Sequence, residues 1–293
     1  MSCVATIGFF DGVHRGHQFL LDCLLKEASQ RGLSSAVLTL EEHPDLVLRG
    51  IRTPLLTTFD ERRQRLLDKG VGQVLPFRFA DIHTLKAEQF LRLIHDHYQV
   101  QVLLMGYDHR FGSDNLGSFD QYQRVAQKVS VELVLIPQAP DITVSSTRIR
   151  EALLQGDVET ANDLLGYDYT LTGTVVHGNA IGRTIGFPTA NLSLPADKLI
   201  PASGVYAVTA QITNQKSSIF NFQFSISLLN IGKNPTLGPN PLSVELHIPD
   251  FDGDLYDQTL SVSLLRRIRP EQTFPSLDAL RTQILHDLHS LWF

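Results

Sequence analysis

Two histidines near the N-terminus stand where a loop enters a helix. His14 and His17 are three residues apart between a short apolar run and a helical pattern, and Gly8, Gly12 and Gly16 punctuate the same stretch. Glycine lets backbone N–H groups approach an anion, and a helix N-terminus adds free donors and positive potential. Two imidazoles can then donate hydrogen bonds to phosphate oxygens as charge grows in a transition state. The stretch therefore predicts a phosphate site.

Two other interpretations of the histidines stay open. They could bind a metal ion from one helical face, although no carboxylate or cysteine stands beside them at ligand spacing. They could also be ordinary surface residues, although Asp11 and the strand–loop–helix context favour the phosphate site.

A second polar run could hold a departing phosphate group. Ser145, Ser146, Thr147 and Arg148 stand together at the start of a helical pattern. Hydroxyls and backbone donors at a helix start bind anions, and arginine adds a charged fork. The alternative interpretation is a plain N-cap followed by a solvated basic pair.

The second half of the chain has its own glycine-rich run, GNAIGRTIGFPTAN. Gly178, Gly182 and Gly186 recur every four residues, and Thr189 and Asn191 follow two residues apart. On an extended segment, residues two apart face the same side. Their oxygen atoms suit Mg²⁺, which keeps several waters and takes few protein ligands. A turn after a strand is the alternative.

A glutamate in a later strand-like run is a candidate base. Glu245 lies in LSVELHI, where Val244 and Leu246 point to the other face. The alternative is a solvated, outward-facing strand residue.

The elements that position the first two groups alternate between strands and helices. Thr58 with Glu61 gives a capping-box pattern for a further helix. Such alternation predicts a mainly parallel sheet covered on both faces, with ligands outside the carboxyl ends of its strands at a switch point. The expected strands are Cys3–Gly8, Ser34–Leu40, Val71–Phe77, Val100–Met105 and Val131–Pro137, and the expected helices include Gly16–Arg31, Ala87–Tyr98 and Phe119–Val129.

After about Leu165 the pattern changes to period-2 runs separated by turn clusters. This predicts an antiparallel β domain, a small barrel. We therefore expect two domains, 1–166 and 167–293, with the boundary near GYDYTLTG. A closing helix from Ser276 should pack on the barrel through Leu277, Leu280, Ile284, Leu288 and Leu291.

Composition narrows the class of protein. The chain has 293 residues, 43% hydrophobic content and a net charge of −6, so a two-domain soluble globule without a nucleic-acid partner is expected. No apolar run approaches the roughly 20 residues of a membrane span, and no secretion signal is seen, so we expect no membrane partner. Two cysteines, Cys3 and Cys23, fit a reducing cytoplasm.

Six stretches, in order, resemble the bacterial bifunctional riboflavin kinase/FAD synthetase family. They are GFFDGVHRGHQ, GYDHRFG, SSTRIREALLQGDVETANDLLG, VVHGNAIGRTIGFPTANL, NIGKNPT and DFDGDLY. The resemblance implies an α/β plus β fold: a Rossmann-like nucleotidyltransferase domain with a parallel sheet, then a small antiparallel riboflavin kinase-like barrel with a terminal helix. It implies phosphorylation of riboflavin by ATP to FMN, then adenylylation of FMN by ATP to FAD with release of pyrophosphate.

The resemblance also assigns roles to residues. Glu245 would take the proton of the riboflavin 5′-hydroxyl. Mg²⁺ would act with ATP, and FMN and FAD would be substrate and product rather than redox cofactors. The implied catalytic residues are His14, His17, Arg148 and Glu245. The implied nucleotide-binding residues are Gly8, Phe10, Asp11, Gly16, Asp108, Ser145, Ser146, Thr147, Gly178, Gly182, Gly186 and Asn230. The implied flavin-binding residues are His43 and Phe111, and the implied metal ligands are Thr189 and Asn191.

Two alternative functions stay open. The first is a riboflavin kinase with weakened or lost adenylyltransferase activity, because Glu42 and His109 stand where the family usually has other residues. The second is a flavin-binding regulator without turnover. The small-molecule partners expected are ATP, riboflavin and FMN, and the sequence gives no expectation for the oligomeric state.

Overall fold

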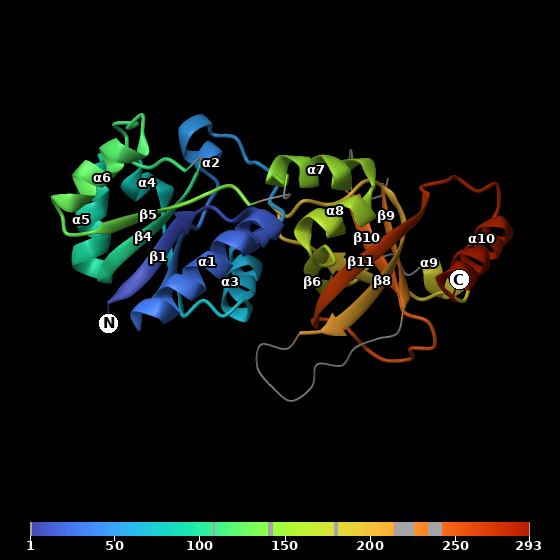
Figure 1. The fold of residues 1–293 in the computed structure, drawn as a ribbon. Helices are drawn as coiled ribbons and strands as arrows, with labels where there is room; N and C mark the ends of the chain where they lie inside the picture. Colours follow the sequence, from blue (N-terminus) through green and yellow to red (C-terminus); the bar gives the residue numbers. More distant parts are fainter. Residues whose placement is uncertain are drawn as a thin grey trace. The chain divides into compact units, whose positions relative to one another are not determined.

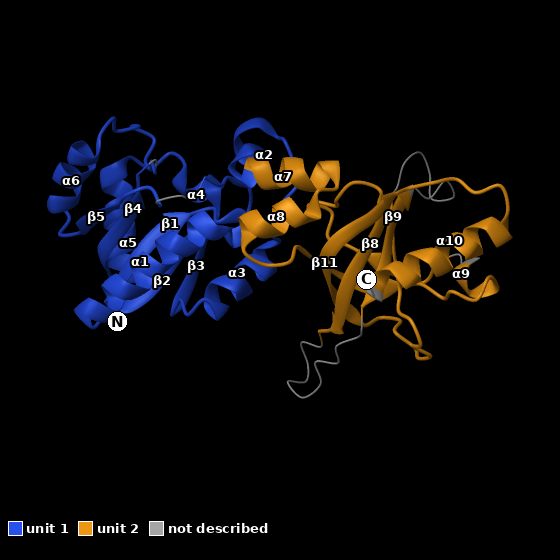
Figure 2. Cartoon of the chain, turned by 45° about the vertical axis from the view of Figure 1, so that its right-hand side comes forward, with its two compact units in different colours: residues 1–146 blue, residues 147–293 orange. Residues whose placement is uncertain are grey.

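The structure is a computed structural model. It describes residues 2–107, 109–139, 143–178, 181–213, 226–233 and 242–292. The chain forms two compact units, Met1–Ser146 and Thr147–Phe293 (Figure 2). Among the described residues, no helix has the length and apolar character that crossing a membrane requires.

The first unit is built on a five-stranded parallel sheet with strand order β3-β2-β1-β4-β5. The strands β1, β4 and β5 of this sheet are labelled in Figure 1. Its strands are β1 Cys3–Gly8, β2 Ser34–Leu40, β3 Gln73–Phe77, β4 Val100–Gly106 and β5 Glu132–Ile136. Its helices are η1 Asp11–Val13, α1 Arg15–Arg31, α2 Pro44–Arg49, α3 Phe59–Asp68, α4 Phe79–Ile82, α5 Ala87–Tyr98 and α6 Phe119–Gln127.

Both faces of this sheet are buried, as predicted. On β1, Cys3, Ala5 and Ile7 pack into one core with residues of α5 and α6, whereas Val4 packs into a second core with residues of α1 and α3. This alternation follows from the period of two along a strand. The predicted capping box of α3, between Thr58 and Glu61, is also present.

The strand order places the histidine loop at a switch point. β1 is the central strand, with β2 on one side and β4 on the other. The loop after β1 therefore emerges where the direction of winding reverses, which is where open α/β sheets bind ligands.

The second unit is a closed barrel with strand order β10-β7-β6-β11-β8-β9, all neighbours antiparallel. Its strands are β6 Thr170–Val176, β7 Ala190–Ser193, β8 Gly204–Ile212, β9 Ser227–Lys233, β10 Leu242–His247 and β11 Thr259–Pro270. The helices are α7 Ser146–Gln155, α8 Val158–Leu165, α9 Ile181–Thr184, α10 Leu277–His289 and η3 Ser290–Trp292.

Contacts group α7 and α8 with the barrel. Asn162 of α8 donates from Nδ2 to the carbonyl of Leu264 at 2.8 Å, and its Oδ1 accepts from the backbone N–H of Tyr169 at 2.7 Å. The contact-based division thus falls before α7, whereas the boundary predicted from the change of pattern lies after α8.

The closing helix differs from its prediction at one end. Ile284, Leu288 and Leu291 pack against a cluster of barrel residues, but the side chain of Leu277 is 57% exposed. Leu277 is the first residue of α10, so the prediction that it packs on the barrel was wrong.

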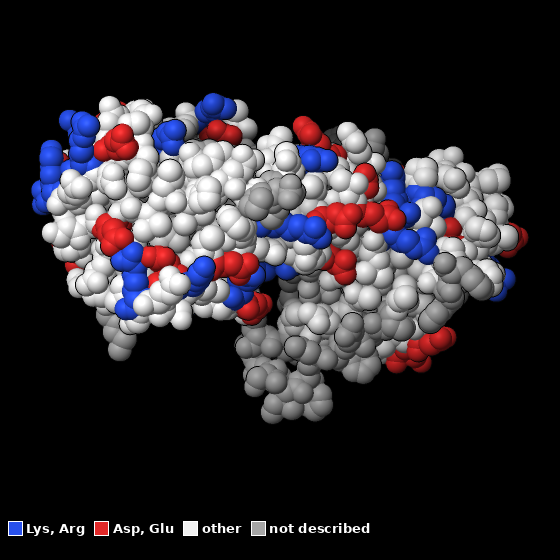
Figure 3. All heavy atoms as spheres, viewed as in Figure 1, with Lys and Arg blue, Asp and Glu red and all other residues white. Residues whose placement is uncertain are grey.

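Charged side chains of both signs lie on the face of the molecule drawn in Figure 3. On the face drawn in Figure 3, lysines and arginines stand in small groups with aspartates and glutamates among them. This distribution agrees with the near balance of 25 basic and 31 acidic residues.

Candidate active sites

His14 and His17 form a stacked pair at the start of α1. His14 has an extended backbone and caps the helix, because its Nδ1 accepts the backbone N–H of His17 at 3.3 Å. The two ring centroids are 3.6 Å apart and the ring planes differ by 12°. The structure thus brings together the two histidines that the sequence singled out.

Asp11 anchors the loop that carries them. Its side chain is buried, and its carboxylate accepts the backbone N–H groups of Leu56 at 3.1 Å and Thr57 at 2.9 Å. Its carbonyl oxygen accepts the Ser146 hydroxyl at 3.0 Å. The carboxylate that the sequence assigned to nucleotide binding is therefore engaged in holding the loop.

Three other predicted residues set the packing and the backbone conformation of the loop. Phe10 has a left-handed backbone with φ of 55°, and its ring lies in the core. A Cβ on Gly8 would come within 2.9 Å of the Phe10 ring, and one on Gly16 would come within 3.1 Å of Val144. Both glycines therefore permit the close packing that sets the loop.

Both imidazoles are neutral near pH 7. Burial lowers the pKa of His14 to about 4. Burial lowers the pKa of His17 well below its ordinary value, and its titratable neighbours His14, Arg62 and His109 add to this lowering. The buried Nδ1 of His17 has no hydrogen-bond partner among the described residues. Buried polar atoms without a hydrogen-bond partner are rare in proteins, and the oxygen of a bound ligand would provide the partner that this atom lacks.

The lowered pKa of His14 predicts acid sensitivity. The unfolded chain binds a proton at this site near pH 6.5, whereas the folded chain binds it only near pH 4. Stability is therefore present above pH 6.5 and is lost as the pH falls toward 4, by roughly 3 kcal/mol at the limit. We expect the His14→Asn variant, which keeps a capping acceptor, to lose less stability across this window than the wild type.

Denaturant unfolding of both proteins across that pH window measures the difference. Equal slopes of unfolding free energy against pH would show that the His14 imidazole is not the group responsible.

Arg62 is a buried charged residue beside the candidate site that sequence reasoning missed. Its side chain is fully buried, its guanidinium lies 4.4 Å from the centroid of the Phe9 ring, and Nη2 donates to the carbonyl of Leu40 at 2.6 Å. Three arginines occur in FDERRQRLL, and composition does not distinguish them. The available signal was helical spacing, since Arg62 stands four residues before buried Leu66.

A cavity of about 540 Å³ lies at the carboxyl ends of β1 and β2, and its lining includes Gly8, Phe9, Leu40 and Phe111. The Tyr122 hydroxyl holds Phe111 through its backbone N–H at 3.1 Å and carbonyl at 2.8 Å. We call this the Phe111 cavity. It has the apolar, aromatic lining expected for a flat ring system.

His43, the other predicted flavin residue, is not among the residues that line the Phe111 cavity. It caps α2 by accepting the backbone N–H of Asp45 at 3.2 Å. Its ring stands edge-on to Phe9, with centroids 5.0 Å apart. Since Phe9 does line the cavity, His43 is placed to support the cavity wall.

The run that begins α7 is largely exposed. Ser145, Thr147 and Arg148 are exposed, and the Ser146 hydroxyl is the group that reaches the Asp11 carbonyl. Asp108 lies outside the described residues.

In the barrel, the predicted metal and base residues converge. Glu245 pairs with Asn191 on β7 and with Asn230 on β9 in the strand register. Directly opposed residues share a face, so the three side chains form a row across neighbouring strands. The Thr189 hydroxyl donates to Glu245 Oε2 at 3.3 Å.

The three glycines of this half are needed for close packing or for their backbone conformation. A Cβ on Gly178 would clash with the Asn191 side chain, and one on Gly182 would clash with the Phe187 carbonyl. Gly186 has φ of +87°, a left-handed conformation that a side chain would strain.

Two cavities meet at Thr189. The Arg183 cavity, about 350 Å³, is lined by Arg183, Thr189, Asp254 and Tyr256 among others. The Glu245 cavity, about 340 Å³, is lined by apolar residues of the barrel and of α10, together with Asn230 and Glu245 of that row. Its lining includes Thr189, Asn230, Glu245, Gly182, Phe187, Phe274, Leu280, Ile284, Arg269 and Asp287.

Arg183 is a second residue that sequence reasoning missed. Among the described residues that line its cavity it is the one Lys or Arg, so it supplies the positive charge there. It stands inside the glycine run, where the regular spacing belongs to the glycines and does not single out the arginine.

The chain combines a parallel sheet that has a histidine loop at its switch point with a barrel that has a threonine–glutamate site, and this combination fits a two-domain transferase. The FAD synthetase family model matches residues 1–148 and the riboflavin kinase family model matches residues 165–291. The chain belongs to the bifunctional riboflavin kinase/FMN adenylyltransferase family.

Relatives match over nearly their whole length. The bifunctional riboflavin kinase/FMN adenylyltransferase of Escherichia coli is 37% identical, with 97% of this chain and 90% of the relative covered. That of Listeria monocytogenes is 35% identical with the same coverage. A crystal structure described as a macrolide-efflux protein from Streptococcus pneumoniae is 32% identical with a TM-score of 0.86, covering 99% of this chain and 93% of that one.

Proposed function

We propose that the barrel makes FMN from riboflavin and ATP, and that the parallel-sheet unit makes FAD from FMN and a second ATP. The observation that supports this proposal is that each unit has its own cavity lined by residues predicted to act there: Phe111 in the parallel-sheet unit, and Thr189 and Glu245 in the barrel. Both domains of the bifunctional family are present, and nothing supports a chain with only the kinase activity.

In the barrel we place riboflavin in the Glu245 cavity and ATP in the Arg183 cavity. Thr189 lines both, so the 5′-hydroxyl and the γ-phosphate would meet beside it. The hydroxyl oxygen attacks the γ-phosphorus, Glu245 takes the hydroxyl proton, and ADP leaves with the electrons of the broken bond. Arg183 offsets negative charge on the phosphates.

The residues at this junction fit Mg²⁺. Thr189 and Asn191 offer a hydroxyl and an amide oxygen beside the Glu245 carboxylate, and magnesium takes hard oxygen ligands of this kind. When bound together with ATP, the ion offsets charge on the phosphate oxygens.

Metal binding is expected to depend on nucleotide. The described residues contain no group of three or more His, Cys, Asp or Glu that could hold a metal, and the junction offers few oxygens to an ion that prefers octahedral coordination. Calorimetric titration of Mg²⁺ into the chain alone should give no tight stoichiometric binding, whereas titration in the presence of a non-hydrolysable ATP analogue should give a saturable signal. Tight binding without nucleotide would contradict this arrangement.

In the parallel-sheet unit we place the flavin ring of FMN in the Phe111 cavity. A phosphate oxygen of FMN attacks the α-phosphorus of ATP, and pyrophosphate leaves. This transfer needs positioning and charge stabilisation rather than a protein nucleophile. The neutral imidazoles of His14 and His17 donate hydrogen bonds to ATP oxygens. Ser145, Ser146, Thr147 and Arg148, where α7 begins, hold the leaving pyrophosphate.

A single incubation tests the whole proposal. The purified chain is mixed with riboflavin, ATP and Mg²⁺, and the flavin products are separated. FAD is the expected end product. FMN alone would indicate a kinase with a lost second activity, and neither product would indicate a flavin-binding protein. We assign the enzyme to the cytoplasm, because its two cysteines are free and a reducing compartment suits them.

A further inference from the structure

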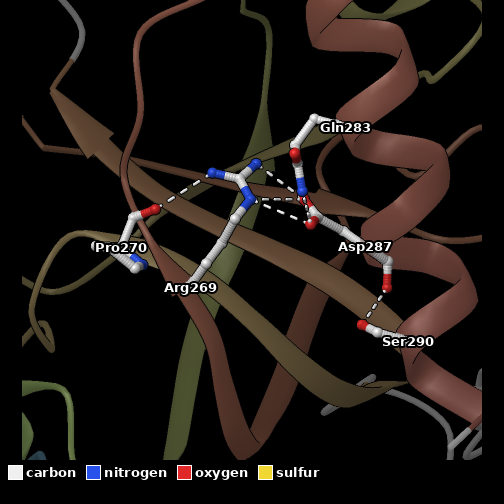
Figure 4. A network of polar contacts seen from close by, with 5 residues as sticks. All are labelled: Arg269, Pro270, Gln283, Asp287 and Ser290. Carbon is white, nitrogen blue, oxygen red and sulfur yellow. Dashed lines mark hydrogen bonds and ion pairs between the residues drawn. The ribbon is translucent and has the colours of Figure 1, made fainter.

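The barrel contains a buried ion pair that the mechanism does not use. Arg269 at the end of β11 points at Asp287 on α10 (Figure 4). Its Nε lies 3.1 Å from Asp287 Oδ1 and 2.9 Å from Oδ2, and its Nη2 lies 2.8 Å from Oδ2. The Asp287 residue is 1% exposed and the Arg269 side chain 13%.

Neighbouring groups complete this network. Gln283 donates from Nε2 to Asp287 Oδ1 at 2.8 Å, and Arg269 Nη1 donates to the Pro270 carbonyl at 3.2 Å. The Ser290 hydroxyl donates to the Asp287 carbonyl at 2.6 Å. The carboxylate is thus held from the strand and from its own helix.

The rest of α10 is only partly buried. Asp287 is the one residue of this described helix that reaches the buried class, while Ile284 and Leu288 are half-buried. Apolar packing alone therefore leaves the helix freedom to slide or tilt. A rigid guanidinium fork on a carboxylate removes that freedom, because it fixes direction as well as distance.

The position of α10 matters because the helix is a wall of the Glu245 cavity. Leu280, Ile284 and Asp287 line that cavity together with Glu245 and Asn230 of the barrel. Phe274, in the segment before α10, also lines it, and its ring centroid lies 5.6 Å from the Arg269 guanidinium. A shift of the helix would change the width of the cavity without touching the phosphate end.

We propose that Arg269 and Asp287 are positioning residues for riboflavin: the pair holds α10 at the distance that lets its apolar side chains close on the flavin ring. This inference rests on the proposed location of riboflavin in the Glu245 cavity. A buried ion pair is weak evidence for added stability, since well-packed apolar residues often serve as well. The fixed geometry at a cavity wall is what distinguishes this pair.

The test uses the full chain with Asp287→Asn and Arg269→Lys. Asp287→Asn keeps the shape and removes the charge, and Arg269→Lys keeps the charge and removes the fork. Riboflavin affinity is measured by the quenching of riboflavin fluorescence, and KM for riboflavin, KM for ATP and kcat are measured by product formation. The control is Asp278→Asn, the same substitution at an exposed position of α10.

In both variants we expect Kd and KM for riboflavin to rise about 10- to 100-fold, as displaced positioning groups cause. The kcat at saturating riboflavin and the KM for ATP should change by less than about threefold, because the phosphate end is untouched. Asp278→Asn should match the wild type.

Unchanged riboflavin affinity in a folded variant would overturn the inference, and so would equal losses for riboflavin and ATP. If Asp287→Asn does not fold, Arg269→Lys decides; loss of folding in both would assign the pair to folding alone and reject its role in riboflavin binding. Failure of the proposed function is separable, because a wild type that binds riboflavin without making FMN leaves the affinity comparison valid.

Discussion

The Glu245→Gln variant is expected to lose riboflavin phosphorylation by about 10²–10⁴-fold, the usual cost of removing a general base. Glutamine keeps the shape and volume of glutamate but cannot accept the hydroxyl proton. Its amide can still contact the Thr189 hydroxyl, which lies 3.3 Å from Glu245 Oε2, so the local structure should persist. Adenylylation of supplied FMN should stay near the wild-type rate.

Steady-state assays of the two half-reactions measure this outcome. Glu159→Gln, at an exposed position of α8, is the matched control and should retain both activities. Normal phosphorylation in Glu245→Gln would show that Glu245 is only a partly exposed strand residue. Loss of both activities in a variant with a native circular dichroism spectrum would show that the two sites are coupled.

The second large effect is expected for His17→Ala, which should cut FMN adenylylation by about 10²–10³-fold, as removal of a preorganised donor does. The cap of α1 should survive, because His14 Nδ1 accepts the backbone N–H of residue 17 and not its side chain. His17→Ala is therefore a cleaner probe than His14→Ala, which would remove the cap as well. Riboflavin phosphorylation should continue, so FMN should accumulate.

Product analysis from riboflavin and from FMN measures this effect. His97→Ala, at an exposed position of α5, is the control and should make FAD normally. An unchanged yield of FAD from FMN in His17→Ala would reject the role of this imidazole in the transfer.

The sequence predicted those elements whose patterns are local. β1, β2 and α5 have their predicted bounds, because each is a continuous apolar run or a helical stripe with clear ends. The four-residue β7 and the short α2 and α4 were not predicted, since they are too short to show a period. Their positions depend on the strands and caps around them.

The length of β11 shows a different limit of prediction from sequence. Apolar residues alternate with serines from Leu260 only as far as Leu264, yet the strand continues to Pro270. The basic residues in the extension remain in the ladder with β8, although the register shifts between Leu264 and Arg266 and between Arg267 and Arg269. Arg269 then meets Asp287, a pairing between distant positions that no local pattern reveals.

Part of each candidate site could be predicted from sequence, because local spacing and residue type point to it. Glycine spacing and residue type selected His14, His17, Thr189 and Glu245, and the structure brings each pair together. The engagement of Asp11 with the loop at Leu56 and Thr57 could not be read from sequence, because the partners are some 45 residues away. The cavities could not be predicted from sequence either, because each is lined by residues of several elements.

The central claim, that one chain carries two complete and independent sites, is tested most directly by mixing the two defective variants. Glu245→Gln and His17→Ala are incubated together with riboflavin, ATP and Mg²⁺, and FAD is measured over time. Neither variant alone should make appreciable FAD from riboflavin. The mixture should make it after a lag, because FMN released by His17→Ala is adenylylated by Glu245→Gln. No FAD from the mixture, although each variant performs its own remaining half-reaction, would contradict the claim.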